Sequence, residues 1–418
     1  MDIKQKLYDA IENNKEELFG ILSDLIKINS ENFGTTGNEA ECARYIDEWF
    51  KALGFVGEVY SPLDIAGITE NPDYYAGRNL ENRFNYSLFL PGITGKKTLT
   101  LAAHIDTVEI GNLADWERPA LSGEIADGKI FGRGACDDKY GIALSMFLIK
   151  KMKELGIELD YNLVFSAYCD EELGGSNGAL ACSLKYQTDD CLNLDGMLGE
   201  ISGSGVGGGE MLFKVSHKSP SDNCDSVLKG MNLLVERLDS FKNNRINELS
   251  NNHIFSGSYV AQNPMRLMYS HIGNTGGTNM DKGEFKITFY TDKEESIIMK
   301  EFSDILLSLE EEFEALGLNK PSAKMVTRFF RYVEDVPSNP VVEKLLKLGA
   351  ENDMPLKSVG MCLSDLPMFN IYGSKRTITL GLARGFGEIG GAHQVNEFID
   401  CDEFVKFAKI VAGFLAEH

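Results

Sequence analysis

The sequence predicts an α/β protein with a mainly parallel sheet, helices on both faces of that sheet and an inserted α+β domain. Strand-like and helical patterns alternate over the first part of the chain. The order of these patterns differs in about residues 204–318, and strand patterns resume nearer the C-terminus. At 418 residues, the chain also exceeds what one hydrophobic core usually serves, so two domains are expected.

The first domain is expected to begin with a helix and to continue with strands and helices. Apolar residues in the N-terminal segment lie close to a helical stripe among Lys, Asp and Glu, which predicts an amphipathic surface helix and not a signal peptide. Further along, β-rich runs predict strands, and an apolar stripe closed by Gly156 predicts a helix. The predicted strands are 86–90, 98–103, 162–168, 191–194 and 377–382, and the predicted helix is 141–155.

The order of strand and helix patterns in about residues 204–318 predicts a compact α+β insert. Its expected elements are a strand at 211–215, a helix at 226–238, strands at 264–271 and 285–290, and a helix at 296–316. The glycine-rich stretch 203–209 that precedes them is typical of a hinge or linker. The predicted domains are therefore a discontinuous first domain, 1–203 and 319–418, and an inserted domain, 204–318.

The composition argues against several classes of partner. A total of 41 basic and 63 acidic residues gives a net charge of -22, which repels nucleic acid and anionic lipid surfaces, so neither is an expected partner. No apolar run reaches the roughly 18 residues of a membrane-spanning helix, and we expect a cytoplasmic protein. The cysteines form no CxxC pair, which favours reduced, mostly buried thiols over disulfides or a cysteine zinc site.

Candidate metal ligands follow the predicted strands or stand in glycine-rich loops. They are His104, Asp137, Glu172, Asp195 and His393. Reactive groups in open α/β sheets collect at the carboxyl ends of strands. Two histidines and three carboxylates form the nitrogen and oxygen ligand set that suits Zn²⁺, with Co²⁺ or Mn²⁺ as substitutes. If one carboxylate is shared, two Zn²⁺ ions each gain three protein ligands and leave room for a bridging water.

Each candidate also has a purely structural interpretation. A lone histidine after a strand is more often a packed or capped surface residue. Asp137 and Asp138 could cap the helix that follows them, and adjacent acids such as those at 170–172 usually form a solvated loop. Asp195 precedes a glycine and so matches a turn signal, whereas His393 could simply end a flexible loop.

Seven short motifs occur in order along nearly the whole chain. They are HIDT at 104–107, DGKIFGRGACDDK at 127–139, DEE at 170–172, NLDG at 193–196, HKSP at 217–220, GTN at 277–279 and HQVNEF at 393–398. Each is weak alone, but their order and spacing are specific. In these motifs the chain resembles the di-zinc family of glutamate carboxypeptidase, cytosolic dipeptidases, aminoacylase and succinyl-diaminopimelate desuccinylase. The resemblance implies a di-zinc exopeptidase-like catalytic domain, and an inserted lid that also forms a homodimer.

The resemblance also implies how the ligands are shared. Asp137 bridges the two metal ions. His104 and Asp195 complete one metal site, and Glu172 and His393 complete the other.

Further roles come from the same resemblance. Glu171 is the general base that activates the metal-bridging water, and Asp106 holds the His104 ring. From the insert, His217 stabilises the oxyanion, and Asn279 lines the same pocket. The alternative for His217 is a polar residue at the end of a strand.

One departure from the family bears on the substrate. Many relatives place an arginine that binds the substrate carboxylate after the strand at 285–290, and this chain has Thr-Asp-Lys at 291–293. Arg384 is the candidate replacement, because a guanidinium binds a carboxylate in a bidentate way and the loop 385–391 offers glycine N–H groups. The alternative is an ordinary surface arginine.

Together these features predict a hydrolase that cleaves an amide bond in a small peptide, as a dipeptidase or carboxypeptidase does. An N-acyl amino acid deacylase of the same fold is the alternative among enzymes. The alternative that is not an enzyme is a metal-binding relative that has lost catalysis. The presence of all the ligand types and of the base argues against this last alternative.

Overall fold

The computed structural model describes residues 2–219, 225–273 and 280–418. The chain divides into two compact units. The first unit comprises Met1–Gly203, Asp335–Val359 and Met368–His418, and the second comprises Ser204–Glu334 and Gly360–Pro367. Within the described ranges, no helix has both the length and the apolar character needed to cross a membrane.

The elements of the first unit alternate between helices and strands along the chain. They are α1 (Ile3–Asn13), α2 (Lys15–Ile26), α3 (Ala40–Ala52), β1 (Glu58–Tyr60), β2 (Asn85–Leu90), β3 (Thr98–His104), β4 (Ile125–Ala126), β5 (Lys129–Phe131), α4 (Lys139–Glu154), β6 (Asn162–Tyr168), α5 (Asn177–Lys185), β7 (Asp190–Leu198), β8 (Glu200–Gly205), α10 (Pro340–Glu351), β13 (Lys357–Met361), α11 (Leu366–Met368), β14 (Thr377–Gly381), β15 (Phe398–Asp400) and α12 (Cys401–Glu417). Of these, β8, β13 and α11 cross a boundary between the units.

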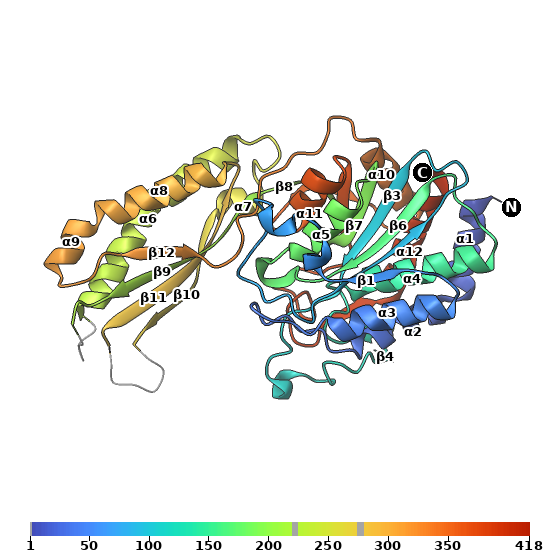
Figure 1. Ribbon diagram of the computed structural model, residues 1–418, viewed down its shortest axis with the longest axis horizontal. Coiled ribbons are helices and arrows are strands. Elements are labelled where there is room, and N and C mark those ends of the chain that lie inside the picture. The colour runs from blue at the N-terminus through green and yellow to red at the C-terminus, as the bar shows by residue number, and fades with distance from the viewer. Residues whose placement is uncertain (1, 220–224, 274–279) are drawn as a thin grey trace. The chain divides into compact units, whose positions relative to one another are not determined.

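An 8-stranded sheet forms the centre of the first unit, in the order β1-β2-β6-β3-β7-β14-β8-β13 (Figure 1). The central strands β6, β3, β7 and β14 run parallel, and antiparallel pairs flank them. The predicted α/β class with a mainly parallel sheet is thus confirmed.

Both faces of this sheet are buried. Leu101 and Ala103 of β3 belong to a core that α2, α4 and α12 share, whereas Ala102 belongs to a second core with residues of α5. Successive side chains of a strand point to opposite faces. A strand buried on both faces therefore appears in the sequence as a continuous apolar run.

The N-terminal segment forms two helices where a single one was expected. The chain breaks between α1 and α2 at Asn14, whose φ of -131° is not helical. Its side-chain Nδ2 donates a hydrogen bond to Ala10 O and so satisfies a carbonyl at the end of α1.

The second unit contains an antiparallel 4-stranded sheet, in the order β10-β11-β9-β12. Its elements are β9 (Gly207–Ser216), α6 (Asp225–Asn251), α7 (Tyr259–Gln262), β10 (Met265–Ile272), β11 (Lys282–Thr291), α8 (Glu295–Ser308), α9 (Glu310–Ala315) and β12 (Ser322–Met325). Phe213 and Val215 of β9 are buried in a core with α6 and α8, whereas Lys214 between them is exposed. This alternation is typical of a sheet covered on one face.

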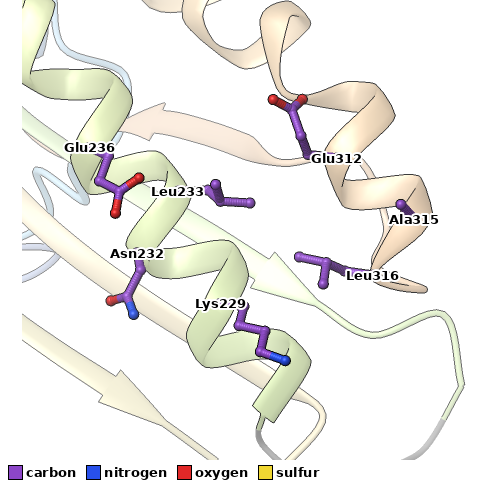
Figure 2. Close-up of a pocket in the computed structure, with 7 residues that line it drawn as sticks. All are labelled: Lys229, Asn232, Leu233, Glu236, Glu312, Ala315 and Leu316. Carbon is purple, nitrogen blue, oxygen red and sulfur yellow. The ribbon is translucent and has the colours of Figure 1, made fainter.

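A cavity of about 510 Å³ lies between α6 and α9 (Figure 2). Leu233 of α6 and Leu316, directly after α9, point toward one another across it. The residues that line this cavity include none of the candidate metal ligands.

Two expectations about the domain junction need correction. The stretch 203–209 is not a linker, because its residues end β8 and begin β9 and are buried. Glycine is needed at position 208 because the main chain of β11 approaches it closely. A Cβ on Gly208 would lie 2.0 Å from Phe289 O. In addition, β12 pairs with β9, so the second unit reaches Glu334, beyond the boundary expected at residue 318.

Candidate metal centre

Three neighbouring strands bring candidate side chains to one edge of the large sheet. β6, β3 and β7 are parallel neighbours. His104 is the last residue of β3, Asp195 lies within β7, and Glu171 and Glu172 follow β6. Because parallel strands end at the same edge, these side chains gather there. The interpretation of Asp195 as a turn residue is wrong, since it belongs to a strand.

Asp137 lies between the two candidate histidines. Its Oδ1 is 2.9 Å from His104 Nε2, and its Oδ2 is 3.2 Å from His393 Nε2. His393 Nε2 is also 2.9 Å from Glu172 Oε2, and His104 Nε2 is 4.0 Å from Asp195 Oδ1. The five side chains therefore form two groups of histidine and carboxylate that share Asp137.

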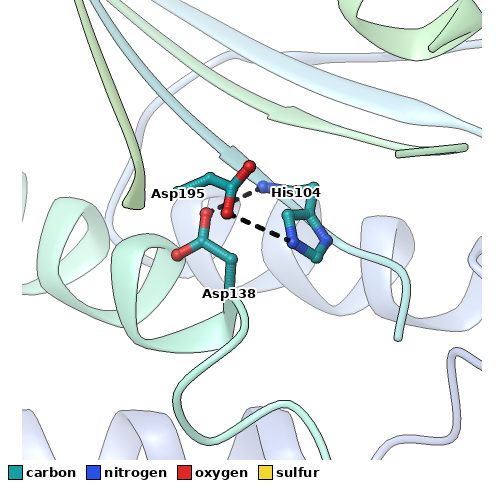
Figure 3. A group of neighbouring side chains, drawn as sticks. All are labelled: His104, Asp138 and Asp195. Atoms are coloured by element: carbon teal, nitrogen blue, oxygen red, sulfur yellow. Dashed lines mark hydrogen bonds and ion pairs between the residues drawn. The ribbon is translucent and has the colours of Figure 1, made fainter. Parts of the chain in front are cut away.

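Asp138 forms a further group with His104 and Asp195 (Figure 3). One possible ligand atom of each residue lies within 4.8 Å of the others. Asp138 Oδ2 also accepts a hydrogen bond from the main-chain N of His104 at 3.2 Å. Although Asp138 directly precedes α4, its side chain makes no capping hydrogen bond to that helix. Its carboxylate instead connects the start of α4 to the end of β3.

The charges around the histidines favour a cation at this site. Burial lowers the pKa of His393, but Glu172 and Asp137 outweigh burial and raise it to about 11. Burial likewise opposes the charge on His104, whereas a hydrogen bond with Asp137 and nearby acids raise its pKa well above the ordinary value. Burial also raises the pKa of Asp137, but both histidines outweigh it and hold that pKa below its usual range. Divalent cations would supply the positive charge that these carboxylates attract.

Asp106 holds the segment that carries Glu171 and Glu172. Its Oδ1 accepts a hydrogen bond from Glu171 N at 3.1 Å, and its Oδ2 accepts one from Glu172 N at 3.0 Å. Asn32 Nδ2 donates to the same Oδ2 at 2.7 Å. The His104 ring is held by the main-chain oxygen of Asp106, 2.8 Å from Nδ1, whereas the Asp106 carboxylate is 3.8 Å away.

Glu171 and Glu172 have different surroundings. Glu172 is 3% exposed, and its Oε1 accepts a hydrogen bond from Val108 N at 3.0 Å while its Oε2 faces His393. Glu171 is partly exposed, and its charge is among those that raise the pKa of His104. Glu172 is thus fixed among the candidate ligands. Glu171 lies near the His104 ring and is accessible to solvent.

A buried ion network supports this segment. Asp170 is 0% exposed, and its Oδ1 lies 3.0 Å from Arg83 Nη1 and 3.1 Å from Arg78 Nε. Arg83 also pairs with the buried Glu39 at 2.5 Å. The interpretation of 170–172 as a solvated loop is therefore wrong. Neither arginine could be identified from the sequence, because no local pattern pairs them with acids so far along the chain.

Glu397 connects the two loops that carry Asp137 and His393. Glu397 is 1% exposed, and its carboxylate accepts hydrogen bonds from Cys136 N at 2.9 Å and from Arg133 Nη1 at 2.8 Å. The same Arg133 nitrogen donates to the main chain of the second loop, at residue 394. Both residues belong to motifs quoted above, but the sequence alone assigned neither a role.

His217 lies in the second unit, directly after β9. Its main-chain N donates to Asp281 O at 2.7 Å, and its ring Nδ1 lies 2.9 Å from Ser219 O. Asn279, the other candidate of the insert, lies outside the described residues.

Arg384 has an acidic partner in the first unit. Its guanidinium is ion-paired with Glu403 and lies 5.2 Å from the centre of the Phe398 ring. After β11, where the family arginine was expected, Lys293 Nζ pairs with Asp292 Oδ1 at 2.7 Å. Binding of a substrate carboxylate by Arg384 would therefore require it to share or exchange Glu403.

No disulfide joins cysteines of the part of the chain that the structure describes. Burial raises the pKa of the Cys136 and Cys169 thiols well above the ordinary value. These buried thiols agree with the expectation of reduced cysteines that serve packing.

The fold and the site are those of a metal-dependent hydrolase. A family model described as Peptidase family M20/M25/M40 matches residues 100–417. The chain therefore belongs to this peptidase family, as the motifs predicted.

Two curated relatives and one solved structure illustrate the range of similar proteins. An uncharacterized metallohydrolase of Methanocaldococcus jannaschii is 36% identical over 179 residues, which cover 41% of this chain and only 39% of that relative. The N-formyl-4-amino-5-aminomethyl-2-methylpyrimidine deformylase of Bacillus subtilis is 23% identical over 98% of this chain and 96% of the relative. Human carnosine dipeptidase 1 matches with a TM-score of 0.74 and 15% identity, covers 100% of this chain and 99% of its own, and so shares the fold.

Proposed function

We propose that the protein hydrolyses an amide bond in a small peptide. It would use two bound Zn²⁺ ions for this reaction, for which Co²⁺ or Mn²⁺ can substitute. The observation that carries this proposal is Asp137, whose two carboxylate oxygens face His104 and His393 separately. A carboxylate placed in this way suits a bridge between two ions. His104 and Asp195 complete one site, and Glu172 and His393 complete the other.

The general base of the proposed reaction is Glu171. Two bound cations would acidify a water molecule and polarise the scissile carbonyl. Glu171 accepts the proton of that water and passes it to the leaving nitrogen. Its main chain is held by Asp106, and the residue is partly exposed. Glu172 is unsuited to this role, because Val108 N and His393 engage its two oxygens.

The competing function is removal of an acyl group from an N-acyl amino acid. The B. subtilis relative, named as a deformylase, favours it, whereas the fold shared with a dipeptidase is compatible with either reaction. A relative without catalysis is the third possibility, and the complete set of candidate ligands with Glu171 argues against it.

A substrate panel separates these three possibilities. We expect protein reconstituted with Zn²⁺, Co²⁺ or Mn²⁺ to turn over dipeptides, measured as release of free amino acids. Turnover of N-acyl amino acids alone would replace the peptidase proposal with the deacylase. If metal-loaded protein turned over neither class, the catalytically silent alternative would be correct.

The His217 side chain is proposed to donate a hydrogen bond to the oxyanion. We expect His217→Ala to lower turnover by about 100-fold, the usual cost of removing one such donor, with unchanged zinc content. His271→Ala is the control, because His271 is an exposed histidine of the same unit. Equal turnover in both variants and the wild type would leave His217 without a catalytic role.

We further propose that the first unit carries catalysis and that the second serves as a lid and as the surface of a homodimer. Leu267, Met268 and Tyr269 of the edge strand β10 are 56%, 46% and 42% exposed. Exposed apolar edge strands readily pair with another chain. The cytoplasmic location and the binding of a substrate carboxylate by Arg384 stay predictions.

A further inference from the structure

The pairing of β7 with β14 changes register beside the candidate ligand Asp195. They pair regularly as far as Asn193 and Thr379, and the next pair is Leu198 with Gly381. The register therefore shifts within the segment of β7 that contains Asp195. Beyond the shift the chain segments bond again through Ala383, whose N donates to Gly196 O and whose O accepts from Leu198 N, each at 2.9 Å.

The hydroxyl of Tyr140 lies at this shift in register. It donates a hydrogen bond to Leu194 O, directly before Asp195, and accepts one from Leu382 N at 2.9 Å. A Cβ on Gly381 would lie 2.0 Å from this hydroxyl, so the glycine leaves the space that the tyrosine needs. One side chain thus bridges the two segments at the point where their direct pairing changes register.

The Tyr140 ring is firmly anchored. It is 0% exposed and meets Phe404 and Phe407 of α12 edge-on, with ring centres 6.3 and 5.9 Å apart. Burial raises the pKa of Tyr140 well above its ordinary value, so the hydroxyl keeps the proton that it donates. Tyr140 also stands three residues after Asp137, at the start of α4.

We propose that Tyr140 is a positioning residue that holds Asp195 at the correct distance from Asp137 and His104, and so sets the affinity of one of the two metal sites. The inference rests on the proposed two-metal function. It concerns the site of His104 and Asp195, because the Tyr140 hydroxyl bonds to β7, the strand that carries Asp195. The competing explanation is that the hydroxyl only stabilises the fold.

The test compares Tyr140→Phe with Tyr161→Phe. Tyr161 is also buried in the first unit, and its hydroxyl donates to a main-chain oxygen, Leu415 O, at 2.8 Å. Both variants lose one buried hydroxyl and keep the ring, so both should lose thermal stability, Tyr140→Phe more because its hydroxyl makes two hydrogen bonds and that of Tyr161 makes one. Only Tyr140→Phe should bind one of two Zn²⁺ ions about 10-fold to 100-fold more weakly, as measured by chelator competition on metal-free protein.

A His393→Ala background identifies the affected site. With the Glu172 site weakened, the remaining Zn²⁺ should still bind more weakly when Tyr140→Phe is added. Equal zinc affinities in Tyr140→Phe and Tyr161→Phe would overturn the positioning role, and so would a Tyr140→Phe protein that fails to fold while Tyr161→Phe folds. A wild-type protein that binds fewer than two Zn²⁺ ions would instead contradict the proposed function itself.

Discussion

Replacement of Glu171 by glutamine is expected to lower turnover by about 10²-fold to 10⁴-fold while the fold and both metal ions are retained. The amide keeps the shape of the side chain but removes the basic oxygen that accepts the proton. Glu171 N remains bonded to Asp106 in the variant, so the segment should keep its place. Steady-state kinetics and metal analysis of the same preparation would measure both effects.

Glu172→Gln is the matched control, because it makes the same chemical change one residue away. A neutral amide is a poorer zinc ligand than a carboxylate, so this variant should lose metal from one site. The two neighbours should therefore have opposite phenotypes. If Glu171→Gln lost metal and Glu172→Gln kept it, their roles would be exchanged. If both variants kept nearly normal turnover, the hydrolase proposal would lose its main support.

Asp137→Ala is expected to empty both metal sites and abolish turnover, because its two oxygens face both histidines. By contrast, His104→Ala and His393→Ala should each weaken a different site. The measurement is the number of Zn²⁺ ions bound per chain after reconstitution, with circular dichroism to confirm that each variant is folded. An Asp137→Ala protein that still binds two ions would exclude the bridging role.

Elements whose pattern is local were predicted well from the sequence. The strand expected at 162–168 coincides with β6, and the helix expected at 141–155 lies within two residues of α4 at each end. Both contain long apolar patterns that packing reinforces. The helix expected at 226–238 proved too short, since α6 continues to Asn251 with a more polar sequence. The stretch 203–209 was misinterpreted, because its glycines serve close packing between strands that are distant in sequence.

The candidate ligands were found through short motifs, and the structure brings them together. The residues that surround them were not found. Asn32 contacts Asp106 across 74 residues of sequence, and Arg83 contacts an acid 87 residues away. A polar residue gives no local indication of such a partner, because its hydrogen bonds depend on the finished fold. Tyr140 likewise carries no local indication of its role, because its hydroxyl bonds to two segments that only the folded sheet brings together.

The position of β14 in the large sheet means that the first unit can complete its sheet only late in synthesis. β14 lies between β7 and β8, although about 170 residues separate it from them in the chain. A ribosome therefore completes the whole second unit before it supplies the strand that closes the first. His393 emerges later still, so a nascent chain could display Asp137 and His104 while their last partner is untranslated. We expect metal capture to be a late event, which follows the synthesis of both units and of His393.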